Sequence, residues 1–138
     1  MPTTEVTAPT GASPAALPKN FLRPCLLLLL REQPAHGYEL LERLRAFGFD
    51  GSDPGGLYRA LRKLEEEGFV SSAWEPSESG PHRRIYEITR PGTRDLHERA
   101  KSLSEARWIL GGFLGRYEEF VALERPGAAV QGSSDAAV

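Results

Sequence analysis

The basic residues between positions 54 and 68 are spaced so that they could bind a polyanion. Leu57, Leu61 and Leu64 recur at steps of four and three, a pattern that predicts one buried stripe along a helix. The other faces would carry the side chains Tyr58, Arg59, Arg62 and Lys63. These cations precede the acidic run Glu65–Glu67, the reverse of the order that the helix macrodipole favours. A phosphate backbone at the helix N-terminus would account for that order, and a solvated helix face is the alternative interpretation.

A second basic cluster lies in a predicted β-hairpin that follows this helix. Residues 69–75 and 83–89 alternate in polarity and contain aromatic and β-branched side chains, which is typical of half-buried strands. The stretch 76–81 predicts the loop between them. The basic residues here are His82, Arg83 and Arg84. Because successive strand residues face opposite sides, we expect one of the two arginines to reach phosphate or the minor groove, with hairpin solubility as the alternative role.

Two further helices are predicted ahead of the basic one, so that the three form a helix-turn-helix. The predicted spans are residue 20 or 24 to 32, residue 36 or 37 to 47, and 54 to 67, the last capped by Ser52 or Asp53. Gly37 would allow tight packing at the start of the second helix, where the Tyr38 hydroxyl would be free to meet a phosphate. The candidate DNA-contacting residues are Tyr38, Gly55, Tyr58, Arg59, Arg62, Lys63, His82, Arg83 and Arg84.

The composition fits one small domain with polar ends. The 138 residues are 40% hydrophobic and 26% charged, and residues 1–18 and 126–138 read as disordered tails. A net charge of −2 argues against polyanion binding by itself, but a local basic patch would suffice. The single Cys25 allows no intramolecular disulfide, and neither a secretory leader nor a transmembrane segment is expected. We therefore expect a cytoplasmic protein.

Residues 91–125 predict a long helix with a heptad stripe. Apolar residues follow alternating steps of four and three, and a second apolar line widens the stripe in the C-terminal half. A monomer of this size would leave that surface in water, so we expect a homodimer. The predicted interface consists of Leu96, Leu103, Leu110, Phe113, Leu114, Tyr117 and Val121.

Trp108 lies beside this seam in a glycine-rich stretch. Its simplest role is in the dimer core. The sharper hypothesis is a pocket in which Trp108, Gly112 and Phe113 take a planar, apolar or aromatic effector at the dimer interface.

The sequence contains no motif that predicts a catalytic site or a metal site. No phosphate-cradling glycine loop precedes a lysine, and no serine or cysteine nucleophile has an evident histidine partner. The histidines and Cys25 lack metal-ligand spacing. We expect neither an enzyme nor a protein with a cofactor or bound metal.

Several of these segments together resemble the PadR family of bacterial transcriptional regulators, which is named for repressors that respond to phenolic acids. The resemblance covers about residues 22–95. Its motifs are Leu27–Leu30, His36–Leu41, Gly56–Tyr58, Ala60–Leu61, Leu64–Gly68, Arg83–Tyr86 and Thr89–Gly92. One departure is Arg59, where the family usually has proline, and it adds a charge at the predicted DNA face.

The resemblance implies a mainly α fold with a small β-hairpin. A winged helix-turn-helix DNA-binding domain at 19–90 would be followed by a single dimerisation helix at 91–125, as in short-form members. It also implies a sequence-specific, ligand-responsive repressor that binds a pseudo-palindromic operator on double-stranded DNA as a homodimer. The alternative is a winged-helix protein-interaction module that does not bind DNA.

Overall fold

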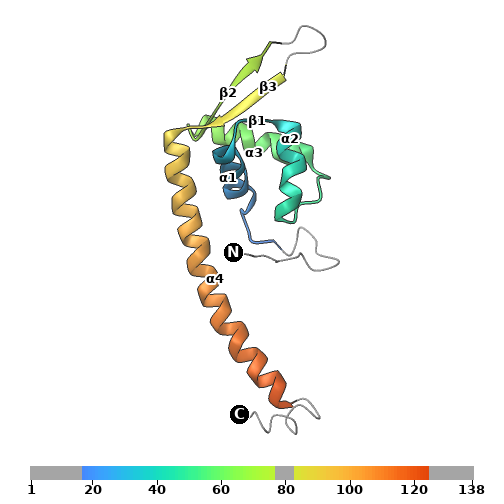
Figure 1. Ribbon diagram of the computed structural model, residues 1–138, viewed down its shortest axis with the longest axis vertical. Coiled ribbons are helices and arrows are strands. Elements are labelled where there is room, and N and C mark those ends of the chain that lie inside the picture. Colours follow the sequence, from blue (N-terminus) through green and yellow to red (C-terminus); the bar gives the residue numbers. More distant parts are fainter. Residues whose placement is uncertain (1–16, 77–82, 125–138) are drawn as a thin grey trace. The chain divides into compact units, whose positions relative to one another are not determined.

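The computed structural model describes residues 17–76 and 83–124, so most of both predicted tails and His82 lie outside the described residues. Its elements are α1 (Leu22–Glu32), β1 (Ala35–His36), α2 (Gly37–Arg43), a 3-10 helix η2 (Leu44–Phe47), α3 (Pro54–Glu66), β2 (Val70–Glu75), β3 (Arg83–Ile88) and α4 (Arg90–Glu124) (Figure 1). The chain divides into two compact units, Met1–Arg99 and Ala100–Val138. The early turns of α4 therefore belong to the first unit, whereas the sequence assigned the whole helix to a separate segment.

The turn into α3 forms as its residues predict. Gly48 and Gly51 adopt positive φ angles of 97° and 78°, a conformation that glycine reaches without steric cost. Asp53, rather than Ser52, is the N-cap, because its carboxylate accepts a hydrogen bond of 2.9 Å from the backbone N–H of Gly56. Pro54 follows at the first helical position. The start of the basic helix is therefore fixed by its own sequence.

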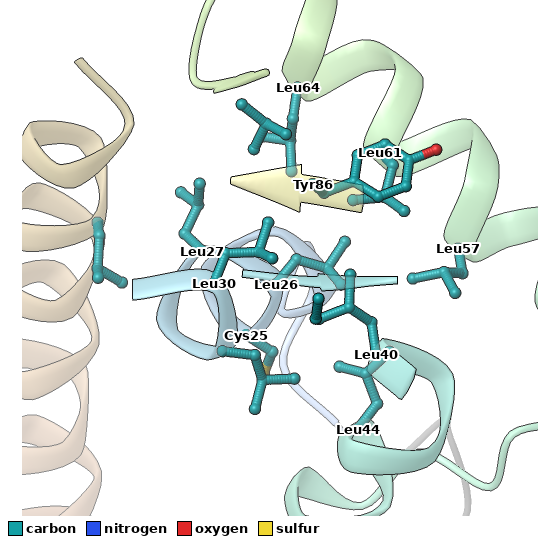
Figure 2. Close-up of a cluster of buried hydrophobic side chains, with 14 residues drawn as sticks. Cys25, Leu26, Leu27, Leu30, Leu40, Leu44, Leu57, Leu61, Leu64 and Tyr86 are labelled. Atoms are coloured by element: carbon teal, nitrogen blue, oxygen red, sulfur yellow. The ribbon is translucent and has the colours of Figure 1, made fainter. Parts of the chain in front are cut away.

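The hydrophobic core of the first unit lies among the three short helices and the sheet. Figure 2 shows leucines of α1, α2, η2 and α3 pointing toward one another, with Tyr86 of β3 beside Leu61. The leucine stripe predicted for α3 is confirmed, since Leu57, Leu61 and Leu64 are fully buried. Cys25 is also buried, and the loss of solvation raises the pKa of its thiol to about 12.

Leu96 of α4 belongs to the same core. Its side chain is only 8% exposed and packs with the buried residues of the winged-helix unit. This burial differs from the prediction that Leu96 lies in a dimer seam. The heptad pattern could not separate the two roles, because a stripe on a long helix can pack on its own domain in one stretch and on a partner in the next.

The sheet has three antiparallel strands in the order β1–β3–β2. The predicted hairpin of β2 and β3 is confirmed, with Val70 opposite Ile88 and Glu75 opposite Arg83 (Figure 1). β1 was not predicted, because two residues after a proline are too few to show an alternating pattern. It pairs Ala35 with Tyr86 and thereby joins the α1–α2 connection to the hairpin.

The start of α4 packs closely on the turn that follows α3. Thr89 caps the helix, because its Oγ1 accepts from the N–H of Gly92 at 3.0 Å and donates to the carbonyl oxygen of Gly68 at 2.7 Å. Gly92 is buried against the carbonyl oxygen of Phe69, with no room for a Cβ atom. Only glycine fits at this position.

The second unit consists of α4 from Ala100 onward as far as the chain is described. Most of its large apolar side chains face solvent, namely Trp108, Ile109, Leu110, Phe113, Leu114, Tyr117, Phe120 and Leu123. Within residues 17–76 and 83–124 no helix has the length and apolarity needed to cross a bilayer.

Candidate nucleic-acid interface

The outward face of α3 is formed by the residues that its leucine stripe excludes. Gly55, Arg59 and Arg62 are exposed, and Tyr58 is 42% exposed. A Cβ atom on Gly55 would lie 3.2 Å from Nη1 of Arg59, so the absent side chain leaves room for the arginine to extend toward the helix N-terminus. Within the described residues, no ion pair joins Arg59 or Arg62 to a carboxylate. Both guanidinium groups are therefore available to an external anion.

Tyr58 is held in place by the start of α2. Any Cβ atom on Gly37 would collide with the Tyr58 ring, which shows how closely the ring approaches the α2 backbone. Tyr58 is thus fixed on one side and open to solvent on the other. The prediction that Gly37 permits tight packing is confirmed, and the packing partner is a residue of the basic helix.

Lys63 differs from the two arginines. Its Nζ lies 3.9 Å from Oε2 of Glu67, and the same glutamate accepts a hydrogen bond from Arg23 of α1. The hydrogen bond from Arg23 is the main reason that the pKa of Glu67 is lowered. Lys63 therefore has an acidic neighbour on the flank toward α1, and its charge is partly balanced within the chain.

The two wing arginines lie on opposite faces of the hairpin, as the alternation predicted. Arg83 donates a hydrogen bond of 2.9 Å to the Tyr38 hydroxyl, and its guanidinium lies 5.6 Å from the centre of that ring. Arg84 lies 5.0 Å from the Trp74 ring centre and donates to Oγ of Ser72 at 2.8 Å. Each cation is thus held against an aromatic ring.

Trp74 was not among the predicted site residues. It is 60% exposed, since it lies near the end of β2, beyond the helices that cover the sheet. Ser72 donates in turn to Glu65 of α3 at 2.8 Å. A chain of polar contacts therefore connects Arg84 to the basic helix.

His36 and Glu75 were also missed. Nε2 of His36 lies 2.7 Å from Oε1 of Glu75, and Nδ1 lies 3.1 Å from Oε1 of Glu39. The His36 ring stacks on Tyr38, with ring centres 5.4 Å apart. The contact between His36 and Glu75 depends on how the hairpin pairs with β1, and spacing along the sequence does not reveal it.

The effector-site candidates lie on the second unit. Trp108, Gly112 and Phe113 line an open groove of about 1030 Å³ on α4, together with residues such as Ile109 and Arg116. No heavy atom would come within 4 Å of a Cβ atom on Gly112. Trp108 is 81% exposed. In the single chain, only residues of α4 line this groove within the part that the structure describes.

Potential metal ligands do not gather anywhere in the part of the chain that the structure describes. In that part, His36 and Glu39 instead form structural hydrogen bonds with each other.

Comparisons with known proteins point to one family. A family model described as the transcriptional regulator PadR-like family matches residues 26–98. A solved structure of a conserved protein of unknown function, described as a potential transcriptional factor, is 38% identical with a TM-score of 0.63, over 73% of this chain and 90% of its own. A PadR-like transcriptional regulator from Bacillus cereus is 28% identical with a TM-score of 0.62, over 70% of this chain and 93% of its own.

A third solved structure agrees with these. A PadR family transcriptional regulator from Eggerthella lenta is 34% identical with a TM-score of 0.54, over 71% of this chain and 81% of its own. A comparison with curated proteins finds no match.

Proposed function

Because this chain belongs to the PadR-like family of transcriptional regulators, we propose that it acts as a homodimeric repressor that binds a pseudo-palindromic operator and is released from it by a small apolar or aromatic effector. The observation that carries the proposal is the outward face of α3, where Arg59 and Arg62 lie beside Tyr58 without a carboxylate partner in the described residues. The wing supplies two further arginines at the adjoining sheet.

The roles of the basic residues follow from how each is held. Arg59 and Arg62 are long, exposed and on the helix that would enter the major groove, so they are the candidates for reading bases. Tyr38 and Arg83 are already hydrogen-bonded to each other, which suits a contact to a phosphate oxygen rather than a base. Lys63 contributes least, because Glu67 lies beside it.

Charge does not oppose this proposal. The net charge of −2 is a sum over the whole chain, whereas DNA binding depends on the local patch that meets the phosphates. The acidic Glu67 lies on the α1 flank through its bond to Arg23. The cations of α3 and the wing can therefore bind phosphates even though the chain as a whole carries a small negative charge.

Dimerisation is proposed through the second unit. Leu110, Phe113, Leu114 and Tyr117 are each about half exposed or more, and Leu103 and Val121 are partly buried. Covering such a surface gains roughly 25 cal/mol per Å² of apolar area removed from water. On α1, Leu28 is 38% exposed amid buried leucines, so it is a second candidate for contact with a partner chain. A two-fold axis would place the two α3 helices on half-sites about one helical turn, or roughly 34 Å, apart.

Effector binding is proposed at the groove of Trp108, Gly112 and Phe113. One helix lines the groove, so a partner helix would supply the opposite wall. An apolar, planar ligand would stack on the indole ring. Such a ligand would bind at the dimer contact and could change the spacing of the two DNA-binding faces.

The test is salt-dependent binding to the DNA upstream of the chain's own gene, followed by fluorescence anisotropy. We expect tight binding to one fragment, a lower affinity for scrambled DNA, and a linear fall of log affinity with log salt concentration. Competition with an unlabelled fragment controls for non-specific binding. Affinity that does not change with salt or sequence would instead support a winged-helix module that binds protein.

A further inference from the structure

Four side chains near the loop end of the wing are linked by contacts. Arg83 and Glu75 face each other across the β2–β3 ladder, at the end where the strands lead into the loop. Glu75 contacts Nε2 of His36 at 2.7 Å, and Arg83 donates to the Tyr38 hydroxyl at 2.9 Å. His36 and Tyr38 stack on each other. We refer to His36, Tyr38, Glu75 and Arg83 as the wing clamp.

The wing clamp connects the hairpin to a rigid support. His36 is the N-cap residue of α2, and its backbone N–H donates to Oε1 of Glu39 at 2.8 Å. Its ring is held from a second side by the contact of Nδ1 with the same oxygen at 3.1 Å. The His36 side chain is only 13% exposed. A ring fixed in this way can restrain the more exposed Glu75 rather than follow it.

Without the clamp, the end of the hairpin has few other restraints. β1 pairs only with Tyr86 and Ile85 of β3, so backbone pairing to the helical part stops before Arg83. Among the strands that the structure describes, none pairs with the outer side of β2. The two side-chain contacts of the clamp are therefore what hold the last residues of both strands to α2.

We propose that His36 and Glu75 are positioning residues for DNA binding: they fix the end of the wing, and with it Arg83, relative to α2 and α3, without contacting DNA themselves. This inference rests on the proposed function, in which the wing contacts DNA. The clamp itself is a property of the free protein, so its effect on wing mobility can be measured without DNA.

A purely electrostatic effect and a positioning role predict opposite changes in DNA affinity for the substitution Glu75→Gln. Glu75→Gln removes a negative charge near a surface that would bind phosphates, and by Coulomb's law alone it would tighten DNA binding. If Glu75 positions the wing, the loss of its contact with His36 frees the hairpin end and weakens binding. Glu87→Gln is the matched control, because Glu87 is exposed on β3 and points to the same side of the sheet as Arg83.

The first experiment measures mobility through Trp74, which adjoins Glu75 in β2. The chain has two tryptophans, so Trp108→Phe leaves Trp74 as the sole reporter. Time-resolved fluorescence anisotropy should show a larger fast component in Glu75→Gln and His36→Ala than in the parent. His36→Gln, which keeps a hydrogen-bond donor, should recover part of the restraint, and Glu87→Gln should match the parent. Unchanged Trp74 mobility in Glu75→Gln would overturn the proposal.

The second experiment measures operator affinity of the same substitutions at fixed salt, made in the chain that retains Trp108. Glu75→Gln and His36→Ala should weaken binding about 1.5-fold to fivefold, the range expected for a partly exposed side-chain contact, whereas Glu87→Gln should leave binding unchanged or tighten it. Equal tightening by Glu75→Gln and Glu87→Gln would contradict the positioning role. A third outcome separates the two proposals. If neither the parent nor any variant binds DNA, but Trp74 mobility rises as expected, the proposed DNA-binding function is wrong while the restraint of the wing by the clamp is supported.

Discussion

The ring of Tyr58 fills the space that any side chain at Gly37 would need. This contact joins the first residue of α2 to the outward face of α3, so the position of a candidate DNA contact depends on a residue of another helix. The half-exposed Tyr58 is thereby presented in one orientation.

Gly37→Ala should therefore displace Tyr58 and weaken operator binding about tenfold, a loss of roughly 1.4 kcal/mol that is within the range for one misplaced contact. The fold should persist, because the ring can rotate toward solvent. Anisotropy with labelled operator gives the affinity, and circular dichroism gives the fold. Gly115→Ala, where no atom lies within 4 Å of the added Cβ, is the control. Full affinity in Gly37→Ala would show that the placement of Tyr58 is immaterial.

Substitution of the α3 cations should distinguish residues that contact bases from residues that only attract the phosphate backbone. Arg59→Ala or Arg62→Ala should each cost about 1 to 3 kcal/mol for the operator if the residue reads a base. Lys63→Ala should cost less, because Glu67 already lies 3.9 Å away. Arg31→Ala, at the exposed end of α1, controls for the change in net charge. A triple variant of Arg59, Arg62 and Lys63 that binds with parental affinity would rule out this face.

The wing arginine Arg83 should behave differently from these residues. If it contacts a phosphate, Arg83→Ala weakens all DNA sequences alike and reduces the slope of affinity against salt by about 1. Titrations at several salt concentrations, with operator and scrambled DNA in parallel, measure both effects. A loss confined to the operator would reassign Arg83 to sequence reading.

If the chain dimerises through α4, charged residues placed in that interface should change its oligomeric state. Leu110→Glu with Leu114→Glu puts two carboxylates into the proposed interface, so light scattering should report monomers at concentrations where the parent is a dimer. Lys101→Glu, at an exposed position on the opposite side of the same helix, should leave the dimer intact. A doubly substituted chain that remains a folded dimer would place the interface elsewhere.

The buried thiol of Cys25 predicts a pH dependence of stability. Burial raises its pKa from the ordinary value of 9.0 to about 12, so the thiol is protonated in both folded and unfolded chains at neutral pH. Above about pH 9 the unfolded chain ionises first, and the free energy of unfolding should fall between pH 9 and pH 12. Cys25→Ala should lack this part of the fall in urea titrations. Identical pH profiles would indicate that the thiol is accessible.

The sequence predicts the parts of the structure that depend on near neighbours. The leucine stripe of α3 and the Asp53 cap are each decided by residues within one or two helical turns, and both form. The contact of His36 with Glu75 joins residues far apart in the sequence and requires the sheet register. The burial of Leu96 likewise depends on which surface the α4 stripe meets. Local patterns do not contain that information.

The pairing of β1 with β3 also has a consequence for folding. Ala35 and Tyr86 lie about fifty residues apart in the chain, and their pairing completes the sheet only when the α1–α2 connection is in place. The hairpin can form early by itself, but its third strand is a long-range contact of the kind that slows folding. The part of the wing near Tyr86 is therefore expected to unfold together with the domain and not independently of it. Amide hydrogen exchange in β3 near Tyr86 should report the global unfolding of the domain, while exchange toward Arg83 reports local opening.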